Sequence, residues 1–123
     1  MAVESKICIS KGLPGLFVDG KPVAAMAYIT YFTDRAHYKD FADAGYELFS
    51  VPIYFGGRGI NPISHISAFS KGIYDVKEKP DYGILDREVG RILEDSPNAM
   101  IFPRVNLMMP KWWCDEHPAE CND

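Results

Sequence analysis

The sequence alternates apolar segments of strand length with segments of helical periodicity. The stretches 23–30 (VAAMAYIT), 47–55 (ELFSVPIYF) and 99–107 (AMIFPRVNL) are mostly apolar and do not alternate with polar residues. Continuous apolar runs of this length are typical of strands buried on both faces, as in a parallel sheet. The alternation of strand and helix therefore predicts an α/β fold with a parallel sheet.

Two helices are expected between these strands. In the first, Tyr38, Phe41 and Ala42 form one apolar stripe, and Thr33 or Asp34 can cap its start. The second helix has the clearer pattern: Asp81 can cap it, and the dipeptide at 96–97 (SP) ends it. Its apolar stripe is made of Leu85, Val89, Ile92 and Leu93.

Residues 7–23 are predicted to form a β-hairpin before the first parallel strand. Asp19-Gly20 supplies the positive φ angles of a type I′ turn, and the flanks 16–18 and 22–23 can pair. Pro52 and Pro103 lie inside predicted strands, where each is expected to mark a bulge or a strand end. The irregular stretch 56–80 has the length of a functional or a disordered segment, and its Ile, Phe and Tyr residues favour one that folds against the rest of the chain.

Composition excludes some classes of function. The 123 residues allow one domain at most, and the net charge of −4 comes without a basic stripe, so nucleic acid is not an expected partner. No apolar run is long enough to span a bilayer, so no membrane is expected either. The first twelve residues do not read as a signal peptide, which slightly favours the cytoplasm and leaves the compartment open.

Metal and cofactor chemistry are not expected. The odd count of three cysteines favours reduced thiols over a disulfide framework. Cys114, His117 and Cys121, with Cys8, lack the tight paired spacing of a structural zinc site. Neither a phosphate-binding glycine loop nor a nucleophile–base constellation is recognisable.

Aromatic and polar residues gather where the predicted strands end. Ligands of parallel α/β folds bind at the carboxyl ends of the strands, where loops begin. After the first strand come Tyr28, Tyr31 and Asp34, and after the second come Tyr54, Arg58 and Asn61. At and after the third strand come Arg104, Asn106, Trp112 and Trp113, with the tryptophans expected on a loop.

This combination of residues suits a sugar site. A sugar ring stacks its apolar face on an aromatic ring, and its hydroxyls need fixed polar partners because unpaired buried polar groups are costly. The candidate substrate-binding residues are Arg104, Asn106, Trp112, Trp113, Tyr28 and Tyr54. Simple packing is the competing explanation for the aromatic residues, and pairing with a neighbouring carboxylate is the competing explanation for Arg104.

Three segments together resemble the start of a β-galactosidase-type glycoside hydrolase, similar to family 42 of clan A. They are LFVDGKPVAAMAYIT (16–30), GIYDVKEKPDYGILDREVGRIL (72–93) and PRVNLMMPKWWCDEHPAE (103–120). In the second segment Tyr74-Asp75 and Asp86 match the family pattern. The third segment is the most specific, and its matching residues are Pro110, Trp112, Trp113, His117, Pro118 and Glu120.

The resemblance implies a partial (β/α)8 barrel. Residues 1–22 would be an N-terminal hairpin, and 23–123 about the first three β/α units of the catalytic domain. Both catalytic glutamates of the family follow later strands, so the chain would contribute part of a galactoside-binding cleft without them. Where the family commonly has an arginine after its second strand, this chain has Ser50, with Arg58 further on. The usual contact to the nucleophile is therefore not expected.

Two alternatives remain open from the residues. The chain could be a small α/β binding module without catalysis, which would need a partner chain because a three-stranded parallel sheet leaves both edges unpaired. It could also be part of a different barrel enzyme, with the two tryptophans serving only to pack the fold. In the barrel interpretations, the remainder of the barrel is the required partner.

Overall fold

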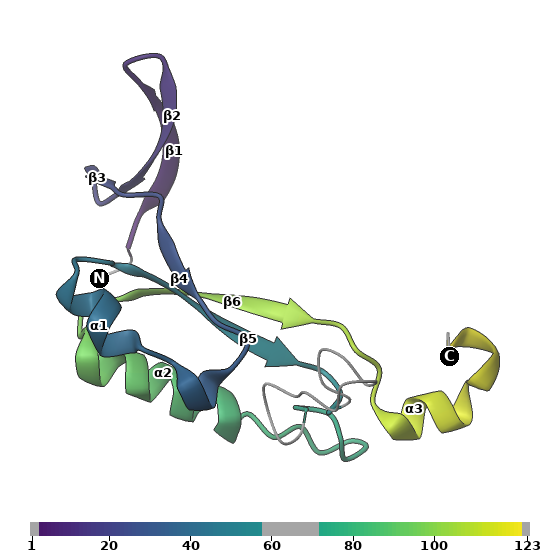
Figure 1. Cartoon of the computed structure of the whole chain (residues 1–123). Helices are drawn as coiled ribbons and strands as arrows, with labels where there is room; N and C mark the ends of the chain where they lie inside the picture. Colours follow the sequence, from purple (N-terminus) through teal and green to yellow (C-terminus); the bar gives the residue numbers. More distant parts are fainter. Residues whose placement is uncertain (1–2, 58–71, 122–123) are drawn as a thin grey trace.

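The computed structural model describes residues 3–57 and 72–121, which form two three-stranded sheets flanked by short helices (Figure 1). The strands are β1 (Ser5–Ser10), β2 (Leu13–Val18), β3 (Lys21–Val23), β4 (Ala27–Ile29), β5 (Leu48–Tyr54) and β6 (Met100–Asn106). The α-helices are α1 (Tyr38–Asp43), α2 (Gly83–Asp95) and α3 (Lys111–Glu116), and the 3-10 helices are η1 (Thr33–Arg35) and η2 (Pro118–Glu120). Within these ranges no helix has the length and apolar character needed to cross a membrane.

The first sheet is an antiparallel meander in the order β1-β2-β3. The predicted hairpin at Asp19-Gly20 is confirmed: both residues have positive φ, 48° and 76°, and Val18 pairs with Lys21 across the turn. A second two-residue turn at Lys11-Gly12 joins β1 to β2 and was not predicted. Lysine carries no turn preference of its own, so only the glycine signals that turn.

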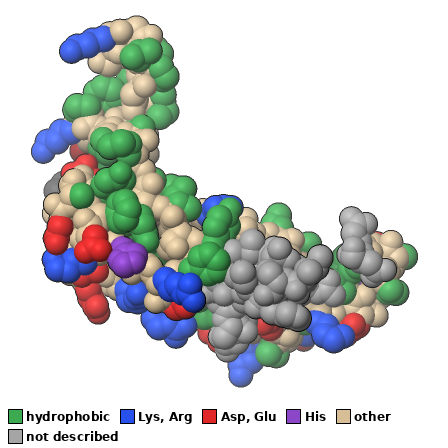
Figure 2. Space-filling model, viewed as in Figure 1, with side chains coloured by type: hydrophobic (Ala, Val, Ile, Leu, Met, Phe, Trp, Pro, Cys, Tyr) green, Lys and Arg blue, Asp and Glu red, His purple; other side chains and the backbone are tan. Residues whose placement is uncertain are grey.

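This meander projects away from the rest of the chain (Figure 1). Its apolar side chains are largely uncovered: Ile7, Ile9 and Leu13 are 68%, 72% and 70% exposed. Figure 2 shows hydrophobic side chains gathered along it. These strands are therefore held by main-chain pairing and turns and contribute little to the core.

The second sheet is parallel, in the order β4-β5-β6, as the alternation of strands and helices predicted. The expected strand at 23–30 is wrong in its extent. Val23 pairs with Leu16 in the antiparallel sheet, whereas β4 begins at Ala27 and pairs with β5. The apolar run 23–30 thus contributes to both sheets, because its first residue pairs with β2 and its later residues pair with β5.

Pro52 and Pro103 do not mark bulges or strand ends. Val51 pairs with Pro103, and Pro52 pairs with Arg104, in an unbroken register. β4 stops pairing with β5 at Ser50, so no described strand pairs with that edge of β5 from Val51 onwards, although Ile73 N donates to Tyr54 O at its end. A proline can occupy such a strand if its missing N–H would have pointed to the unpaired side.

The helices cover one face of the parallel sheet (Figure 1). Tyr38, Phe49, Val51 and Ile92 form the buried core on that face, where α1 packs on α2 and α2 on β5. Successive side chains of a strand point to opposite faces, so Ser50 and its register partners Ile29 and Phe102 lie on the face opposite to Phe49 and Val51. That opposite face, hereafter the open face, lies away from this core, although Ser50 and Pro52 on it are fully buried.

The helix boundaries differ from the prediction at three places. α1 begins at Tyr38, and Thr33 and Asp34 lie in η1 without capping it. Asp81 accepts a hydrogen bond from Gly83 N at the start of α2, although the N-cap position belongs to Tyr82. The predicted loop carrying both tryptophans is wrong, because they lie in α3 directly after Pro110. The described strands form an open sheet, and the partial barrel stays a prediction.

Candidate functional site

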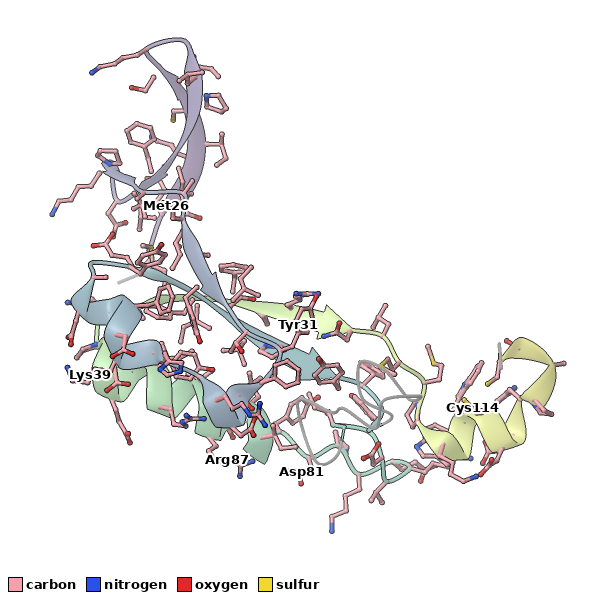
Figure 3. All side chains as sticks on the ribbon, in the orientation of Figure 1. Met26, Tyr31, Lys39, Asp81, Arg87 and Cys114 are labelled. Atoms are coloured by element: carbon pink, nitrogen blue, oxygen red, sulfur yellow. The ribbon has the colours of Figure 1, made fainter. Side chains whose placement is uncertain are left out.

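Arg104 and Tyr31 meet at the carboxyl end of the parallel sheet. Arg104 Cζ lies 4.1 Å from the centroid of the Tyr31 ring, a cation–π contact. Arg104 pairs with Pro52 in register and so shares its face of the sheet, opposite the helices. Figure 3 shows Tyr31 beside β6, well apart from Arg87 on α2. Arg104 thus reaches across β5 to the end of β4 on the open face.

Within the described ranges, Arg104 has no carboxylate partner. Asp34, the carboxylate in the loop after β4, lies 3.9 Å from Arg35 in an exposed ion pair. Ring stacking occupies the flat face of a guanidinium and leaves its N–H edges available for a planar acceptor. Half-buried Arg104 therefore presents a positively charged, bidentate donor on the open face.

Asn106 follows Arg104 by two residues in β6 and lies on the same face. Its Nδ2 donates to the carbonyl oxygens of Ile53 and Arg104, both over 3.3 Å. Because both contacts are to carbonyl oxygens, the contacting atom must be the amide nitrogen. Both N–H groups are thereby used, and Oδ1 is left as an acceptor for a ligand hydroxyl.

Ser50 is fully buried on the open side of β5. In register it stands between Ile29 and Phe102, which are 48% and 41% exposed. Its Oγ has no hydrogen-bond partner among residues 3–57 and 72–121. Sequence comparison drew attention to Ser50 only as a departure from the arginine expected there, and the structure places it beside Arg104's register partner, Pro52.

Trp112 fastens α3 to the segment that precedes α2. Its Nε1 donates to Tyr74 O over 2.7 Å, and Lys77 Nζ lies 5.2 Å from its ring centroid. Lys77 also forms an ion pair with Glu116 at the end of α3. These contacts give Trp112 a packing role, which was the competing explanation for the tryptophans.

Trp113 points to a different neighbour. Its ring stacks on His117 with centroids 4.6 Å apart and planes inclined by 23°. Both tryptophans are half-buried, and no described contact joins either of them to Arg104 or Asn106. The structure therefore does not bring the tryptophans and the arginine into one cluster.

Tyr28 lies on the face opposite to Arg104 and Asn106, because it pairs with Phe49, whereas Tyr54 is the register partner of Asn106. The Tyr28 ring packs 4.1 Å from Phe41 on the helix-covered face, and its hydroxyl accepts a hydrogen bond from His37 N. Tyr54 is 3% exposed and packs against Ile84, and burial raises the pKa of its phenol. Core packing half-buries Tyr28 and buries Tyr54, and a sugar contact of either ring stays a prediction. Arg58 and Asn61 lie outside the described residues.

Asp75 has a structural role that the sequence did not predict. Its carboxylate accepts hydrogen bonds from Gly57 N over 2.6 Å and Gly72 N over 2.7 Å. The two glycines flank the stretch 58–71 in sequence. Asp75 therefore ties together the two points where that stretch leaves and rejoins the described chain.

A charged cluster lies on the other side of the sheet. Glu88, 4% exposed, accepts from Arg91 Nη1 over 2.9 Å, and the same nitrogen donates to Thr33 O over 2.7 Å. Tyr38 O–H donates to Glu88 Oε2 over 3.4 Å. Burial, then the Glu88 charge, raises the pKa of Tyr38 far above 10.0. This cluster joins η1, α1 and α2.

Other chemistry finds no support in the described part of the chain. No three His, Cys, Asp or Glu side chains gather there to hold a metal ion. An open groove of about 660 Å³ lies at the far, amino end of β6, between it and β2, and its lining includes Leu16, Leu48 and Phe102. The groove is largely apolar and holds none of the predicted site residues.

The Arg104 cluster is thus the best candidate site: a stacked guanidinium and an amide oxygen on an open sheet face. It can bind and orient an oxygen-rich ligand, but it contains no general acid or base. Comparisons of this chain with models of protein families, with curated proteins and with solved structures each found no match, so its function is argued from this geometry.

Proposed function

We propose that this chain forms part of the sugar-binding cleft of a retaining, β-galactosidase-like glycoside hydrolase. The observation that carries the proposal is the Arg104–Tyr31 pair, with Asn106 beside it, at the carboxyl end of a parallel sheet. In barrel enzymes that end of the sheet is where substrates bind. The proposal gives this chain a binding role and assigns no catalytic residue to it.

The uncovered surfaces of the sheet are consistent with further β/α units beside it. Phe102 on the open face and Val105 on the helix side of β6 are 41% and 50% exposed. A parallel strand normally has both faces covered. Neighbouring strands would close the open face inward, and a further helix would cover Val105.

The structure also changes the set of residues that we propose to bind the sugar. Arg104 and Asn106 are retained as sugar-binding residues, and Tyr31 joins them as a ring beneath the guanidinium. Trp112 is reassigned to packing because its N–H is bonded to Tyr74. Trp113 remains a candidate wall residue through the indole face that His117 does not cover.

Ligand-observed saturation-transfer NMR on the 123-residue chain tests this proposal. Methyl β-D-galactoside is expected to receive saturation from the wild-type chain, and less from Asn106→Ala, which removes the free amide oxygen. Arg87→Gln, on the exposed surface of α2, is the matched control and should leave the signal unchanged. Absence of any saturation transfer to galactoside or to other neutral glycosides would overturn the proposal.

The alternative of a small non-catalytic module is favoured by one observation, the unpaired outer edges of β4 and β6 within the described sheet. Such a module would need a partner chain along those edges. Sedimentation velocity and calorimetry separate the two functions. A concentration-dependent dimer with one cooperative unfolding transition would favour the module over part of a barrel.

A further inference from the structure

We infer that the Arg104 cluster selects a sugar that carries a carboxylate, such as a uronic acid, over the neutral sugar. This inference rests on the proposed function and names the substrate class of the same site. The juxtaposition behind it is a half-buried guanidinium without a carboxylate among the described residues, beside an amide that offers only an acceptor.

The charge of Arg104 is the first step. A guanidinium that is partly removed from water is stabilised by a nearby anion. Where the protein has no carboxylate beside the guanidinium, an anionic ligand can provide that stabilisation. The described neighbours of Arg104 are the Tyr31 ring and the Pro52 side of β5, neither of which carries charge. A ligand hydroxyl would leave this charge uncompensated.

The geometry of the stack is the second step. Because Tyr31 holds the flat face of the guanidinium, its rotation is restricted while its N–H edges stay free. A planar carboxylate accepts two parallel N–H bonds from such an edge, and these charge-assisted bonds are about twice as strong as neutral ones.

Asn106 supplies the third step. Its N–H groups are both donated to the main chain, so only Oδ1 can contact a ligand, and Oδ1 requires a donor. A sugar hydroxyl is such a donor. Arg104 and Asn106 together therefore recognise an anionic group and a neighbouring hydroxyl. A uronic acid ring carries both groups, whereas a simple carboxylate carries only the first.

A titration with matched ligands tests the inference. Methyl β-D-galacturonide and methyl β-D-galactoside differ only in the carboxylate at the sixth carbon. Amide and arginine side-chain N–H shifts of the full 123-residue chain are followed while each is added, with acetate as a third ligand. The galacturonide is expected to bind about 10- to 100-fold more tightly than the galactoside, as charge-assisted bonds to a single arginine allow.

The variants identify the residue responsible. Arg104→Gln should remove the preference: galacturonide binding should weaken by most of that roughly 10- to 100-fold difference, and galactoside binding, which loses only a weaker bond to a neutral hydroxyl, should weaken by much less. Arg104→Lys keeps the charge but not the planar edge, and should retain only a small part of the preference. Arg87→Gln removes an equal charge at a distance and should change nothing. An unchanged main-chain spectrum shows that each variant folds.

The outcomes separate this inference from the function beneath it. Equal affinity for galactoside and galacturonide, or a preference that survives Arg104→Gln, overturns the acidic-sugar inference and leaves the sugar cleft standing. Binding of neither sugar overturns both. Acetate binding as tight as galacturonide binding, again through Arg104, overturns the sugar cleft, since Asn106 would then contribute nothing.

Discussion

The indole Nε1 of Trp112 donates a hydrogen bond to the main-chain oxygen of Tyr74 over 2.7 Å. The two residues come from different elements, α3 and the segment before α2, and Lys77 strengthens the junction through its ion pair with Glu116. A tryptophan next to a strand end suggested a ligand platform. This bond shows instead that Trp112 holds α3 in place.

Trp112→Phe should loosen α3, because phenylalanine keeps an aromatic ring but has no N–H to donate. Loss of one hydrogen bond to a main-chain oxygen costs about 1 kcal/mol. Hydrogen exchange at the His117 amide, which closes the last turn of α3 on Trp113 O, reports the local opening free energy. Trp113→Phe is the control with a smaller expected effect, and equal effects of the two changes would contradict the role given to Trp112.

Asp75→Asn should remove one of the two hydrogen bonds that hold Gly57 and Gly72 together. An amide has one acceptor oxygen, so it cannot bind both Gly57 N and Gly72 N as the carboxylate does. Hydrogen bonds to a charged group contribute about 1.5–3 kcal/mol, and exchange at one or both of these amides should quicken accordingly. Asp86→Asn on the exposed face of α2 is the matched control. Unchanged exchange at both glycines would contradict the assignment.

Three Gly→Ala changes should have opposite effects that depend on position. A Cβ on Gly56 would lie 2.7 Å from Met109 O, and one on Gly72 would lie 2.5 Å from Gly56 C. Both neighbours are main chain and cannot turn aside, so each change should cost at least about 1–3 kcal/mol. Gly90, in α2, has nothing within 4 Å, and Gly90→Ala should stabilise the helix by about 0.5–1 kcal/mol.

Hydrogen exchange checks these three variants at two places. The Ile73 amide, bonded to Tyr54 O, reports the junction near Gly56 and Gly72, and the Ser96 amide, bonded to Ile92 O, reports α2. A Gly56→Ala chain that keeps wild-type protection at Ile73 would show that the junction can relax, against the expectation.

Arg91→Met should destabilise the packing of α1 on α2. The change leaves the buried Glu88 carboxylate without its cation and leaves Thr33 O with the longer bond from Ala36 N in place of its 2.7 Å bond from Arg91. Breaking a buried pair costs about 3–5 kcal/mol, and because Arg91 is itself 38% exposed we expect about 2 kcal/mol. Adding Glu88→Gln removes the stranded charge and should recover part of the loss, measured by exchange in α2. No recovery would indicate that the Thr33 bond dominates.

Stability should fall at alkaline pH because of Tyr38 and Tyr54. Burial raises the pKa of both phenols in the folded chain, and Glu88 raises that of Tyr38 further. The unfolded phenol has a pKa near 10.0, so this stability is fully present below about pH 10. It is lost as the pH rises toward the folded-state values, since the unfolded chain then binds fewer protons.

Ultraviolet absorbance of the ionised phenols follows this directly. The buried phenols should ionise only together with loss of structure, and Tyr38→Phe should make the loss of stability with pH shallower. Ionisation of every tyrosine near pH 10 with the fold intact would contradict the burial argument.

Local sequence signals predicted the elements that depend on neighbouring residues. They failed for elements whose position depends on contacts between residues far apart in the chain. The turn at Asp19-Gly20 and the stripe of α2 were predictable because dihedral preference and helical period act within a few residues. The start of α1 was misplaced because Thr33 and Asp34 belong to a separate 3-10 turn, which is held to α2 by the long-range bond from Arg91 to Thr33 O. The parallel order of β4, β5 and β6 followed from the alternation of element types.

The candidate site divides in the same way. That Arg104 and Asn106 share one face of a strand follows from their spacing alone, because side chains two residues apart in a strand lie on the same face. Three contacts depend on the packing of distant segments: Tyr31 lies under Arg104, Trp112 donates to Tyr74, and Tyr28 packs against the helices. Each of these contacts joins segments far apart in the chain, and they depend on how the sheet twists and how its two faces are covered.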